Sequence, residues 1–421
     1  MIEEAKKAKA AARVLATLDS SVKNSALEAI CKALKKNKDK IIEANLADLE
    51  KECPDTLKKR LKYDEGKLND SIKGIKALIE LEEPINKVTL HTTLDDGLEL
   101  YRTTCPIGVI GVIFESRPDA LVQIASLCLK SGNAVFLKGG SEALNTNIAL
   151  SEVIYAAGVN AGLPEGWLHL LTTRDDVNEM LTMNGYIDLI IPRGSNEFVQ
   201  FIMQHTAIPV LGHADGVCHT YINAECDPEI ALKVAIDAKT QYVSVCNCTE
   251  TFLVDKSLEG DLLQHLVIEL AKAGVKIYGD DYMAERFNCE RVNDWHHEYL
   301  DYKVSIKVVS GVDEAIEHIN QYGSGHTDAI ITENKEIAEK FMQAVDSSSV
   351  LVNCSTRFAD GFRYGFGAEV GISTSKIHAR GPVGLEGLVS YKYKLIGHGD
   401  IVADYASGRK EFKHIQRGLD K

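Results

Sequence analysis

The sequence contains no apolar run that approaches the roughly 18 residues of a membrane-spanning helix, so we expect no membrane protein. It also lacks an excess of positive charge: Lys and Arg number 47 against 61 Asp and Glu, and the formal net charge is −14. Because an acidic surface repels phosphate backbones, general nucleic-acid binding is disfavoured. A local basic pocket for one anionic small molecule remains compatible with this charge.

Several signature motifs are missing as well. No apolar segment follows the charged start of the chain, so we expect no secretory signal, a cytoplasmic location and reduced cysteines. No Walker A loop is present, which argues against an ATP-driven enzyme of that class. Neither HExxH nor paired CxxC spacing occurs, and we predict no metal site. The loop histidines His213, His219 and His378 keep a zinc site conceivable.

The order of elements along the 421 residues predicts an α/β protein of two or three domains. The first eighty residues have helical periodicity. From residue 109 to 211, short apolar strand-like runs alternate with helical ones, and a second unit of the same style begins near residue 227. Such alternation predicts open parallel sheets covered by helices on both faces. Between the helices and the first sheet, an Asp96-Gly97 pair predicts a β-hairpin over 87–104.

Two predicted turns from strand to helix carry candidate ligand-binding residues. One presents Lys138, Gly139 and Ser141, and the next presents Arg193, Gly194 and Ser195. Open α/β sheets bind ligands at the carboxyl ends of their strands, where helix N–H groups hold phosphate. Two such turns in one sheet favour a phosphate-bearing cofactor. Both residues also have an alternative without a binding function. Lys138 could be a solvated lysine in an ordinary turn, and Arg193 could pair with a surface carboxylate.

A third candidate is the pair Cys246-Asn247, which lies between a predicted helix and a predicted strand. A thiolate is a potent nucleophile, and the asparagine amide could stabilise an oxyanion. Spacing alone leaves open a merely buried cysteine, or the same role for Cys248 or Cys218. Gly365 to Gly371 match a GxGxxxG pattern by letter. Because no helix start follows them, we interpret this segment as a turn-rich wall of an active site.

Taken together, these residues resemble the γ-glutamyl phosphate reductase family of the aldehyde dehydrogenase superfamily over essentially the whole chain. The resemblance rests on 114–118 (Phe-Glu-Ser-Arg-Pro), 137–140, 188–194, 208–213, 246–247, 322–327 (Tyr-Gly-Ser-Gly-His-Thr), 355–361 and 378–382. The chain departs from the family in having Tyr242-Val243-Ser244-Val245 before the cysteine and Cys248 after it.

The resemblance implies an aldehyde dehydrogenase-like fold with a Rossmann-type cofactor domain, an α/β catalytic domain and a small β-flap for oligomerisation. On this basis residues 1–86 form N-terminal helices of the cofactor domain, and 87–105 form the flap hairpin. Residues 106–226 bind the cofactor, 227–360 form the catalytic domain, and 361–421 return to the cofactor domain and supply an oligomerisation tail. A homo-oligomer, dimer or tetramer, is expected.

The resemblance also implies a reaction, namely reduction of L-glutamyl 5-phosphate by NADPH to L-glutamate 5-semialdehyde and phosphate in proline biosynthesis. Cys246 would carry a thioester, assisted by Asn247. Lys138 and Ser141 would favour the 2′-phosphate of NADPH, because NAD-preferring relatives often have a glutamate at the latter position. Glu298 resembles the glutamate that holds the nicotinamide ribose. A glutamate 5-kinase would supply the substrate.

Substrate recognition needs local cations on this acidic chain. We predict that Ser116, Arg117 and Arg357 bind the substrate, since the arginine fork suits carboxylate and phosphate. Both arginines have the alternative of bracing their own loops. Three other functions stay open: a hydrolytic NAD(P)-dependent aldehyde dehydrogenase, a zinc-dependent enzyme resembling histidinol dehydrogenase, and a degenerate nucleotide-binding scaffold. Val210 stands where hydrolytic relatives have a water-activating glutamate, which counts against the first.

Overall fold

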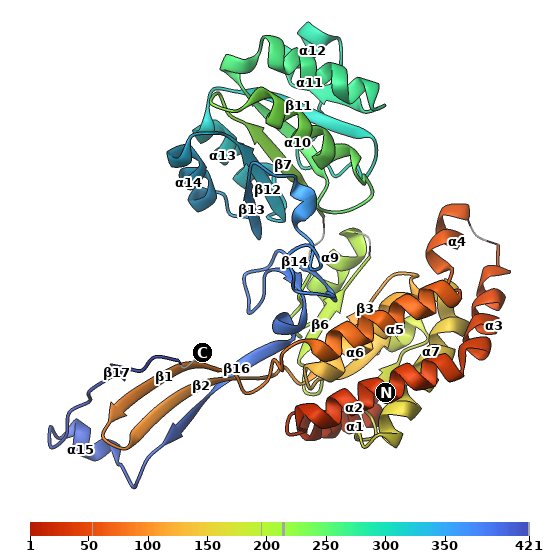
Figure 1. Ribbon diagram of the computed structural model, residues 1–421, viewed down its shortest axis with the longest axis vertical. Coiled ribbons are helices and arrows are strands. Elements are labelled where there is room, and N and C mark those ends of the chain that lie inside the picture. Colours follow the sequence, from red (N-terminus) through yellow and green to blue (C-terminus); the bar gives the residue numbers. More distant parts are fainter. Residues whose placement is uncertain (53, 195, 213–214, 420–421) are drawn as a thin grey trace.

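A computed structural model describes residues 1–52, 54–194, 196–212 and 215–419. Figure 1 shows two α/β bodies joined by a narrow region, with a long β arm that projects from the side of the lower body. Each body has its own parallel sheet. The expected α/β fold with parallel sheets is therefore confirmed.

The first body contains a four-stranded parallel sheet of order β5-β4-β3-β6. Its strands are β3 (Val109–Ile113), β4 (Ala134–Lys138), β5 (Leu168–Leu170) and β6 (Leu189–Pro192). Every residue of β3, β4 and β6 is buried, as expected for a parallel sheet covered on both faces. The strand predicted at 209–211 is reduced to one parallel bridge between Ile190 and Val210.

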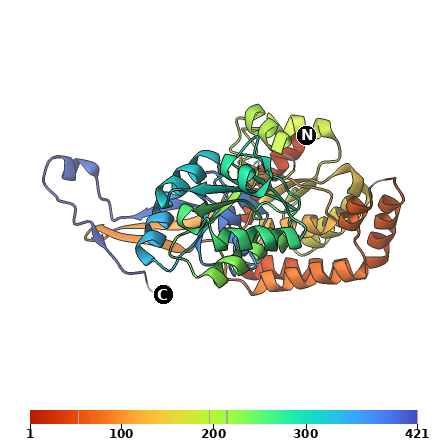
Figure 2. The same cartoon turned by 90° about the horizontal axis from the view of Figure 1, so that it is seen from above.

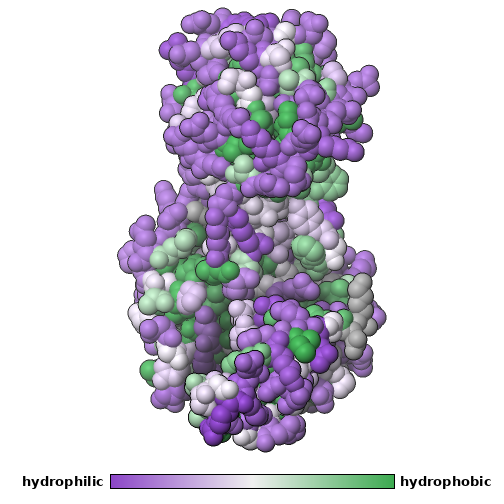
Figure 3. Space-filling view, turned by 90° about the vertical axis from the view of Figure 1, so that its left-hand side faces the viewer, coloured by the Kyte–Doolittle hydropathy of each residue, from purple (hydrophilic) through white to green (hydrophobic). Residues whose placement is uncertain are grey.

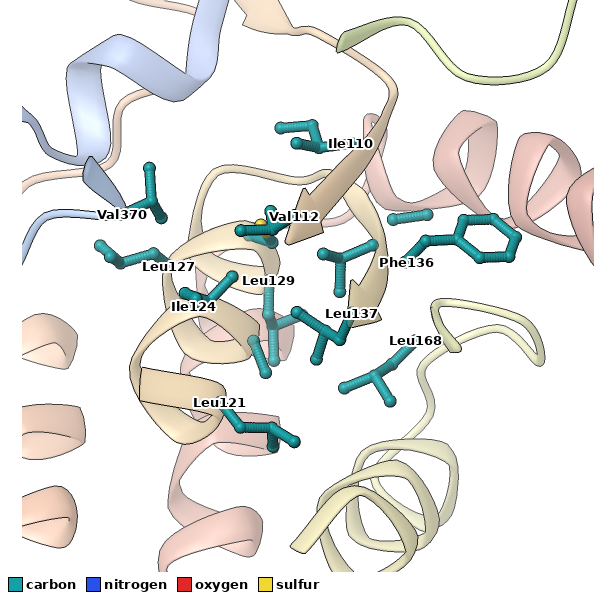
Figure 4. Close-up of a cluster of buried hydrophobic side chains, with 14 of the residues drawn as sticks. Ile110, Val112, Leu121, Ile124, Leu127, Leu129, Phe136, Leu137, Leu168 and Val370 are labelled. Atoms are coloured by element: carbon teal, nitrogen blue, oxygen red, sulfur yellow. The ribbon is translucent and has the colours of Figure 1, made fainter. Parts of the chain in front are cut away.

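Helices cover this sheet and close its core. They are α1 (Ile2–Leu15), α2 (Ser20–Lys36), α3 (Lys38–Leu49), α4 (Asp55–Leu61), α5 (Glu65–Glu80), α6 (Pro118–Lys130), α7 (Leu144–Asn160), α8 (Arg174–Leu181) and α9 (Asn196–His205). Figure 4 shows Leu121, Ile124 and Leu127 of α6 beside Val112 of β3 and Leu137 of β4. Burial of each such side chain contributes about 1.5–3 kcal/mol, which fixes the strand ends that carry the candidate residues.

The second body contains a seven-stranded sheet of order β10-β9-β11-β8-β7-β12-β13, parallel throughout. Its strands are β7 (Cys218–Ile222), β8 (Thr249–Asp255), β9 (Lys276–Gly279), β10 (Glu290–Arg291), β11 (Lys303–Val309), β12 (Thr327–Ile331) and β13 (Ser349–Val352). The helices around it are α10 (Pro228–Thr240), α11 (Asp261–Lys272), α12 (Asp281–Phe287), α13 (Val312–Tyr322) and α14 (Lys335–Ala344).

The strand β7 changes the expected domain boundary. From the sequence we expect the cofactor domain to end at residue 226 and the catalytic domain to begin at residue 227. However, β7 hydrogen-bonds to both β8 and β12 in the centre of the second sheet. The catalytic sheet therefore begins at Cys218, because a strand belongs with the partners that satisfy its backbone groups.

The projecting arm is an antiparallel sheet of order β16-β2-β1-β17. The hairpin of β1 (Val88–Asp95) and β2 (Leu98–Pro106) is the one that the Asp96-Gly97 turn predicts. β16 (Val389–Ile396) pairs along β2, and the short β17 (Ile415–Gln416) pairs with β1. The helix α15 (Val402–Ala406) lies at the arm's far end in Figure 1. We call these elements the flap.

The segment between the catalytic domain and the flap contains little regular structure. It holds the short strands β14 (Gly371–Ser373) and β15 (Gly381–Val383) and the 3₁₀ turns Thr356–Phe358 and Leu385–Leu388. Residues 365–371 lead into β14 rather than into a helix, so they lack the geometry of a dinucleotide loop. Seen from above, the catalytic body overlies this junction (Figure 2).

The described residues include no helix that is both long and apolar enough to cross a membrane. Hydrophilic side chains cover most of the face in Figure 3, and green hydrophobic areas gather mainly on the lower body.

Candidate active site

Cys246 lies in the loop between α10 and β8, in the catalytic domain. Its backbone packs directly against Gly216, which precedes β7: a Cβ at Gly216 would lie 2.0 Å from the Cys246 carbonyl oxygen. That same oxygen accepts a hydrogen bond of 3.1 Å from the Cys218 thiol. Contacts from the neighbouring strand β7 therefore fix the position of the Cys246 backbone.

The residue Cys246 is partly exposed as a whole, but the surroundings of its thiol disfavour the thiolate. Burial raises the pKa of Cys246 to about 12, and the negative charges of Glu298 and Glu369 act in the same direction. The positive charge of Arg193 opposes them. At neutral pH the resting thiol is therefore protonated, and nucleophilic attack requires a proton acceptor.

A histidine lies beside this thiol. His326 Nε2 is 3.1 Å from Cys246 Sγ, and the imidazole is buried between α13 and β12. Sequence reasoning used His326 only as part of the motif 322–327 and gave it no role. The eighty positions that separate the two residues hide their contact. Only the strand order β8-β7-β12 brings them together, because β8 follows Cys246, β12 follows His326 and β7 alone lies between the two strands.

The two competing cysteines are less suited to attack. Cys218 and Cys248 are completely buried, and burial raises the pKa of Cys248 to about 11 and that of Cys218 well above its usual value. The Cys248 thiol donates to the Lys239 carbonyl oxygen at 3.3 Å. Of the three thiols, Cys246 alone is partly exposed.

Asn247 follows the cysteine and ties its loop to the junction segment. Its Nδ2 donates to the Ala359 carbonyl oxygen at 2.9 Å, and its Oδ1 is buried without a hydrogen-bond partner among the described residues. One amide hydrogen is therefore already used. The oxyanion role predicted for Asn247 requires the second amide hydrogen or the backbone N–H.

Two predicted cations lie near Cys246. Arg357 is buried, its Nε donates to Gln241 Oε1 at 3.0 Å, and burial lowers its pKa, whereas the charges of the Cys248 and Cys246 thiolates would raise it. Arg193 extends from the end of β6 in the cofactor domain and influences Cys246 electrostatically. We predict that Arg193 binds the cofactor, and its positive charge also acts to lower the pKa of Cys246.

Two carboxylates border the same region. Burial raises the pKa of Glu369, whose Oε2 accepts a hydrogen bond of 2.9 Å from the Gly361 N–H. Burial also raises the pKa of Glu298, and a hydrogen bond from the Gly216 N–H partly offsets this. The position of Glu298 beside Gly216 and Cys246 agrees with a residue that holds the reacting end of a cofactor, and that role stays a prediction.

The other predicted cofactor residues lie at the carboxyl edge of β3 and β4. Burial lowers the pKa of Lys138, whose Nζ donates to the Gly139 carbonyl oxygen at 2.6 Å. Ser141 is exposed at the start of a 3₁₀ turn before α7. Gly194 follows β6 at the same edge, and Ser195 lies outside the described residues.

Two residues predicted to bind substrate lie at this edge rather than at the thiol. Ser116 Oγ donates to Glu142 Oε2 at 2.7 Å, beside Gly140. Arg117 is half-exposed and pairs with Asp119 at 2.9 Å. Neither has a hydrogen bond to the Cys246 loop in the described structure, so the substrate role of Ser116 and Arg117 stays a prediction, and Arg357 is better placed for it.

No group of three or more His, Cys, Asp or Glu side chains in the described part of the chain is arranged to hold a metal ion. Of the loop histidines, His219 pairs with Asp328 at 3.1 Å and His378 Nε2 lies 2.9 Å from the Gly387 carbonyl oxygen. His213 lies outside the described residues.

Comparisons with known proteins agree with this geometry. Residues 1–282 match the aldehyde dehydrogenase family. The chain is 60% identical over 406 residues to γ-glutamyl phosphate reductase of Ruminiclostridium cellulolyticum, an alignment that covers 95% of this chain and 94% of that protein.

Solved structures extend the comparison to the fold. The crystal structure of γ-glutamyl phosphate reductase from Thermotoga maritima superposes with a TM-score of 0.93 at 39% identity and covers 95% of this chain and 99% of that one. A glyceraldehyde-3-phosphate dehydrogenase from Methanocaldococcus jannaschii, solved with NADP, shares only the fold: 18% identity, a TM-score of 0.67 and 94% of each chain. The chain belongs to the aldehyde dehydrogenase family and, within it, to the γ-glutamyl phosphate reductases.

Proposed function

We propose that the chain reduces L-glutamyl 5-phosphate to L-glutamate 5-semialdehyde and phosphate with NADPH, in proline biosynthesis. The observation that carries this proposal is the position of Cys246, a partly exposed residue whose thiol is under the electrostatic influence of the cations Arg193 and Arg357, in a chain 60% identical to a γ-glutamyl phosphate reductase. The substrate carries an α-carboxylate and a phosphate, and these two cations can neutralise such groups.

The chemistry starts at the thiol. The Cys246 thiolate attacks the acyl carbonyl, the carbon–oxygen bond to phosphate breaks, and a thioester forms. Bound NADPH supplies a hydride for the reduction of that thioester. The resulting hemithioacetal on Cys246 then loses its carbon–sulfur bond, which releases the aldehyde and regenerates the thiolate. Asn247 and the backbone of its loop stabilise the oxyanion of both tetrahedral species.

The residues at the carboxyl edge of the first sheet fit a dinucleotide. A Cβ at Gly139 would lie 2.3 Å from Asn147 Nδ2, and one at Gly140 would lie 2.2 Å from Ser116 Oγ, so the packing around both positions requires glycine. Asn147 Oδ1 is buried without a hydrogen-bond partner among the described residues. Glycines at the carboxyl end of a strand and before a helix are typical of a phosphate-binding edge in an open α/β sheet. Lys138 and Arg193 with Gly194 would hold the cofactor from two strands.

Preference for NADPH over NADH follows from the charges at this edge. Lys138 is a cation and Ser141 is neutral, so no carboxylate at position 141 repels a 2′-phosphate. The neighbouring Glu142 is held by Ser116, and that hydrogen bond lowers the pKa of Glu142. Glu142 therefore stays negatively charged, but the Ser116 hydroxyl, in the loop after β3, holds its carboxylate.

Hydrolysis of the thioester is the second candidate activity, and Val210 disfavours it. Val210 occupies the position before Leu211-Gly212 where hydrolytic relatives would have glutamate, and it packs against the apolar core of the cofactor domain. A valine has no group that can activate water, so phosphate is the expected acceptor of the acyl group.

The test is the reverse reaction: NADP reduction by glutamate 5-semialdehyde, with and without inorganic phosphate. We expect strict dependence on phosphate and loss of several orders of magnitude in kcat for Cys246→Ala, with NADPH binding retained. Cys248→Ala is the matched control and should stay active. Phosphate-independent NADP reduction would favour the hydrolytic alternative. No turnover at all would favour a degenerate scaffold.

We also propose that the flap mediates a homo-oligomer. The outer strand β16 is largely exposed, including Tyr391, Tyr393, Leu395 and Ile396. An exposed strand edge with apolar side chains is a template for pairing with a second chain. Light scattering should give a dimer or larger species for the full chain, and Leu395→Asp should shift it toward monomer.

A glutamate 5-kinase is the class of enzyme that must supply the labile acyl phosphate.

A further inference from the structure

We propose that His326 is a catalytic residue of this site: its imidazole takes the proton from the Cys246 thiol and passes it to the departing phosphate. The second step, proton transfer to phosphate, rests on the reaction proposed above. The contact that carries it is the 3.1 Å separation between His326 Nε2 and Cys246 Sγ. Of the described side chains, only that of His326 lies within hydrogen-bonding distance of this sulfur.

The other ring nitrogen determines which tautomer faces the thiol. His326 Nδ1 lies 2.8 Å from the hydroxyl of Thr327, whose side chain is buried with it. When Nδ1–H donates to this hydroxyl, Nε2 carries the lone pair and accepts the thiol hydrogen. The Thr327 hydroxyl can accept this hydrogen bond, so the contact is compatible with the tautomer that acts as a base.

The backbone around His326 holds the ring in place. Its carbonyl oxygen accepts hydrogen bonds from the Ser349 N–H, at 3.1 Å, and from the Ser348 hydroxyl. The preceding Gly325 has a φ of +69°, which glycine adopts without strain, and its carbonyl oxygen accepts from the Ser348 N–H at 2.9 Å. A rigid, fully buried imidazole lies at a fixed distance from the sulfur, as general-base catalysis requires.

The surroundings of the thiol explain why it needs this base. Burial and the carboxylates Glu298 and Glu369 raise the pKa of Cys246, and Arg193 offsets them only in part. Transfer of the proton to His326 converts a neutral thiol and a neutral imidazole into a thiolate and an imidazolium, whose charges attract one another in a partly desolvated site.

The protons balance through one turnover. The thiol proton moves to Nε2 as the sulfur–carbon bond forms. The imidazolium then gives that proton to the phosphate oxygen as the carbon–oxygen bond breaks, and hydrogen phosphate leaves. After hydride delivery, the carbon–sulfur bond breaks and leaves a thiolate beside a neutral imidazole. One proton from solvent restores the thiol, so each reduction consumes one NADPH and one proton.

The experiment compares His326→Gln with a matched control, His265→Gln, on the exposed side of α11. Two rates are measured at pH 7.5: iodoacetamide alkylation of Cys246, followed by mass spectrometry of its peptide, and kcat for phosphate-dependent NADP reduction. For His326→Gln we expect alkylation to slow at least tenfold and kcat to fall by about 10²–10⁴-fold, with NADP affinity unchanged. The control should match wild type in both.

Rates for His326→Gln within twofold of wild type in both assays would overturn the proposal. Thr327→Val tests the proposal even if His326→Gln does not fold, because this variant keeps the imidazole of His326 and removes only the neighbouring hydroxyl. It should lower both rates by a smaller factor than His326→Gln, and wild-type rates in Thr327→Val would refute the role given to the tautomer. If the wild-type chain does not turn over these substrates but alkylation still depends on His326, the proposed substrate is wrong and the Cys–His pair stands.

Discussion

Replacing Gly216 with alanine should displace Cys246, the proposed nucleophile, without changing any side chain that we place in the reaction. A Cβ at this position would lie 2.0 Å from the carbonyl oxygen of Cys246, 2.4 Å from its Cα and 2.6 Å from its carbonyl carbon. All three are backbone atoms, so no side-chain rotation can relieve the contact. The φ of Gly216 is not positive, and the penalty is therefore the clash alone.

The size of the effect follows from the distances. Non-bonded carbon atoms prefer a separation of about 3.5–4.0 Å, so the Cys246 loop must move by about 1 Å or more. A displacement of about 1 Å in a reacting group costs on the order of 10² in rate. Overpacking of this kind also costs about 1–3 kcal/mol in free energy of unfolding. We expect kcat/KM for semialdehyde to fall by about 10²-fold while NADP affinity changes little.

Steady-state kinetics, NADP titration by fluorescence and thermal melting measure these three effects. The matched control is Gly212→Ala in the same segment, where the nearest atoms to a new Cβ are those of Pro192 at 3.4 Å. That variant should keep kcat/KM within a few-fold of wild type. If Gly216→Ala and Gly212→Ala have the same kcat/KM, the close packing of Gly216 on the Cys246 backbone does not govern the reaction.

Three further changes test other parts of the structure. Arg357→Lys should raise KM for semialdehyde or phosphate strongly, with NADPH affinity and melting temperature nearly intact, whereas a pure loss of stability would assign Arg357 to loop bracing. Ser141→Glu should move preference from NADPH toward NADH by about 1–3 kcal/mol, and an unchanged ratio of kcat/KM for the two cofactors would disprove this placement of the adenosine pocket. Burial lowers the pKa of His318 to about 3, so below its unfolded pKa of about 6.5 only the unfolded chain takes up this proton. Stability should fall by about 1 kcal/mol from this residue between pH 7 and pH 5.5, and His318→Phe should flatten that slope in urea titrations.

The strands of the cofactor domain were predictable because their side chains are uniformly apolar. The sequence predicts strands over 109–114 and 134–138 and a helix over 119–130. β4 (Ala134–Lys138) has these bounds, and β3 and α6 each differ from them by one residue at one end. β7 was missed because its sequence, Cys-His-Thr-Tyr-Ile, looks mixed although every residue is buried. Its polar groups are satisfied across the sheet: the His219 N–H donates to Asp328 at 2.7 Å, and the Thr220 and Thr249 hydroxyls lie 2.8 Å apart. Periodicity cannot reveal partners that lie so far apart in the sequence.

The candidate site shows the same limit. The sequence indicated Lys138 and Arg193 because a strand followed by a cation and then a glycine is a local pattern. The contact between Cys246 and His326 depends on the strand order β8-β7-β12, which no local pattern encodes. Likewise Ser116 came from a motif, and its bond to Glu142 becomes visible only when β3 and β4 are placed side by side.

The two sheets meet at the site through opposite ends of their strands. Lys138 and Arg193 lie at the carboxyl ends of β4 and β6, the edge where an open α/β sheet binds ligands. Gly216, Cys246 and His326 instead precede the amino ends of β7, β8 and β12, three neighbouring parallel strands. The proposed nucleophile and its proposed base therefore belong to one edge of the second sheet, and the residues proposed for the cofactor belong to an edge of the first sheet. A change that shifts one sheet against the other should impair turnover more than it impairs either NADPH binding or the contact between thiol and imidazole.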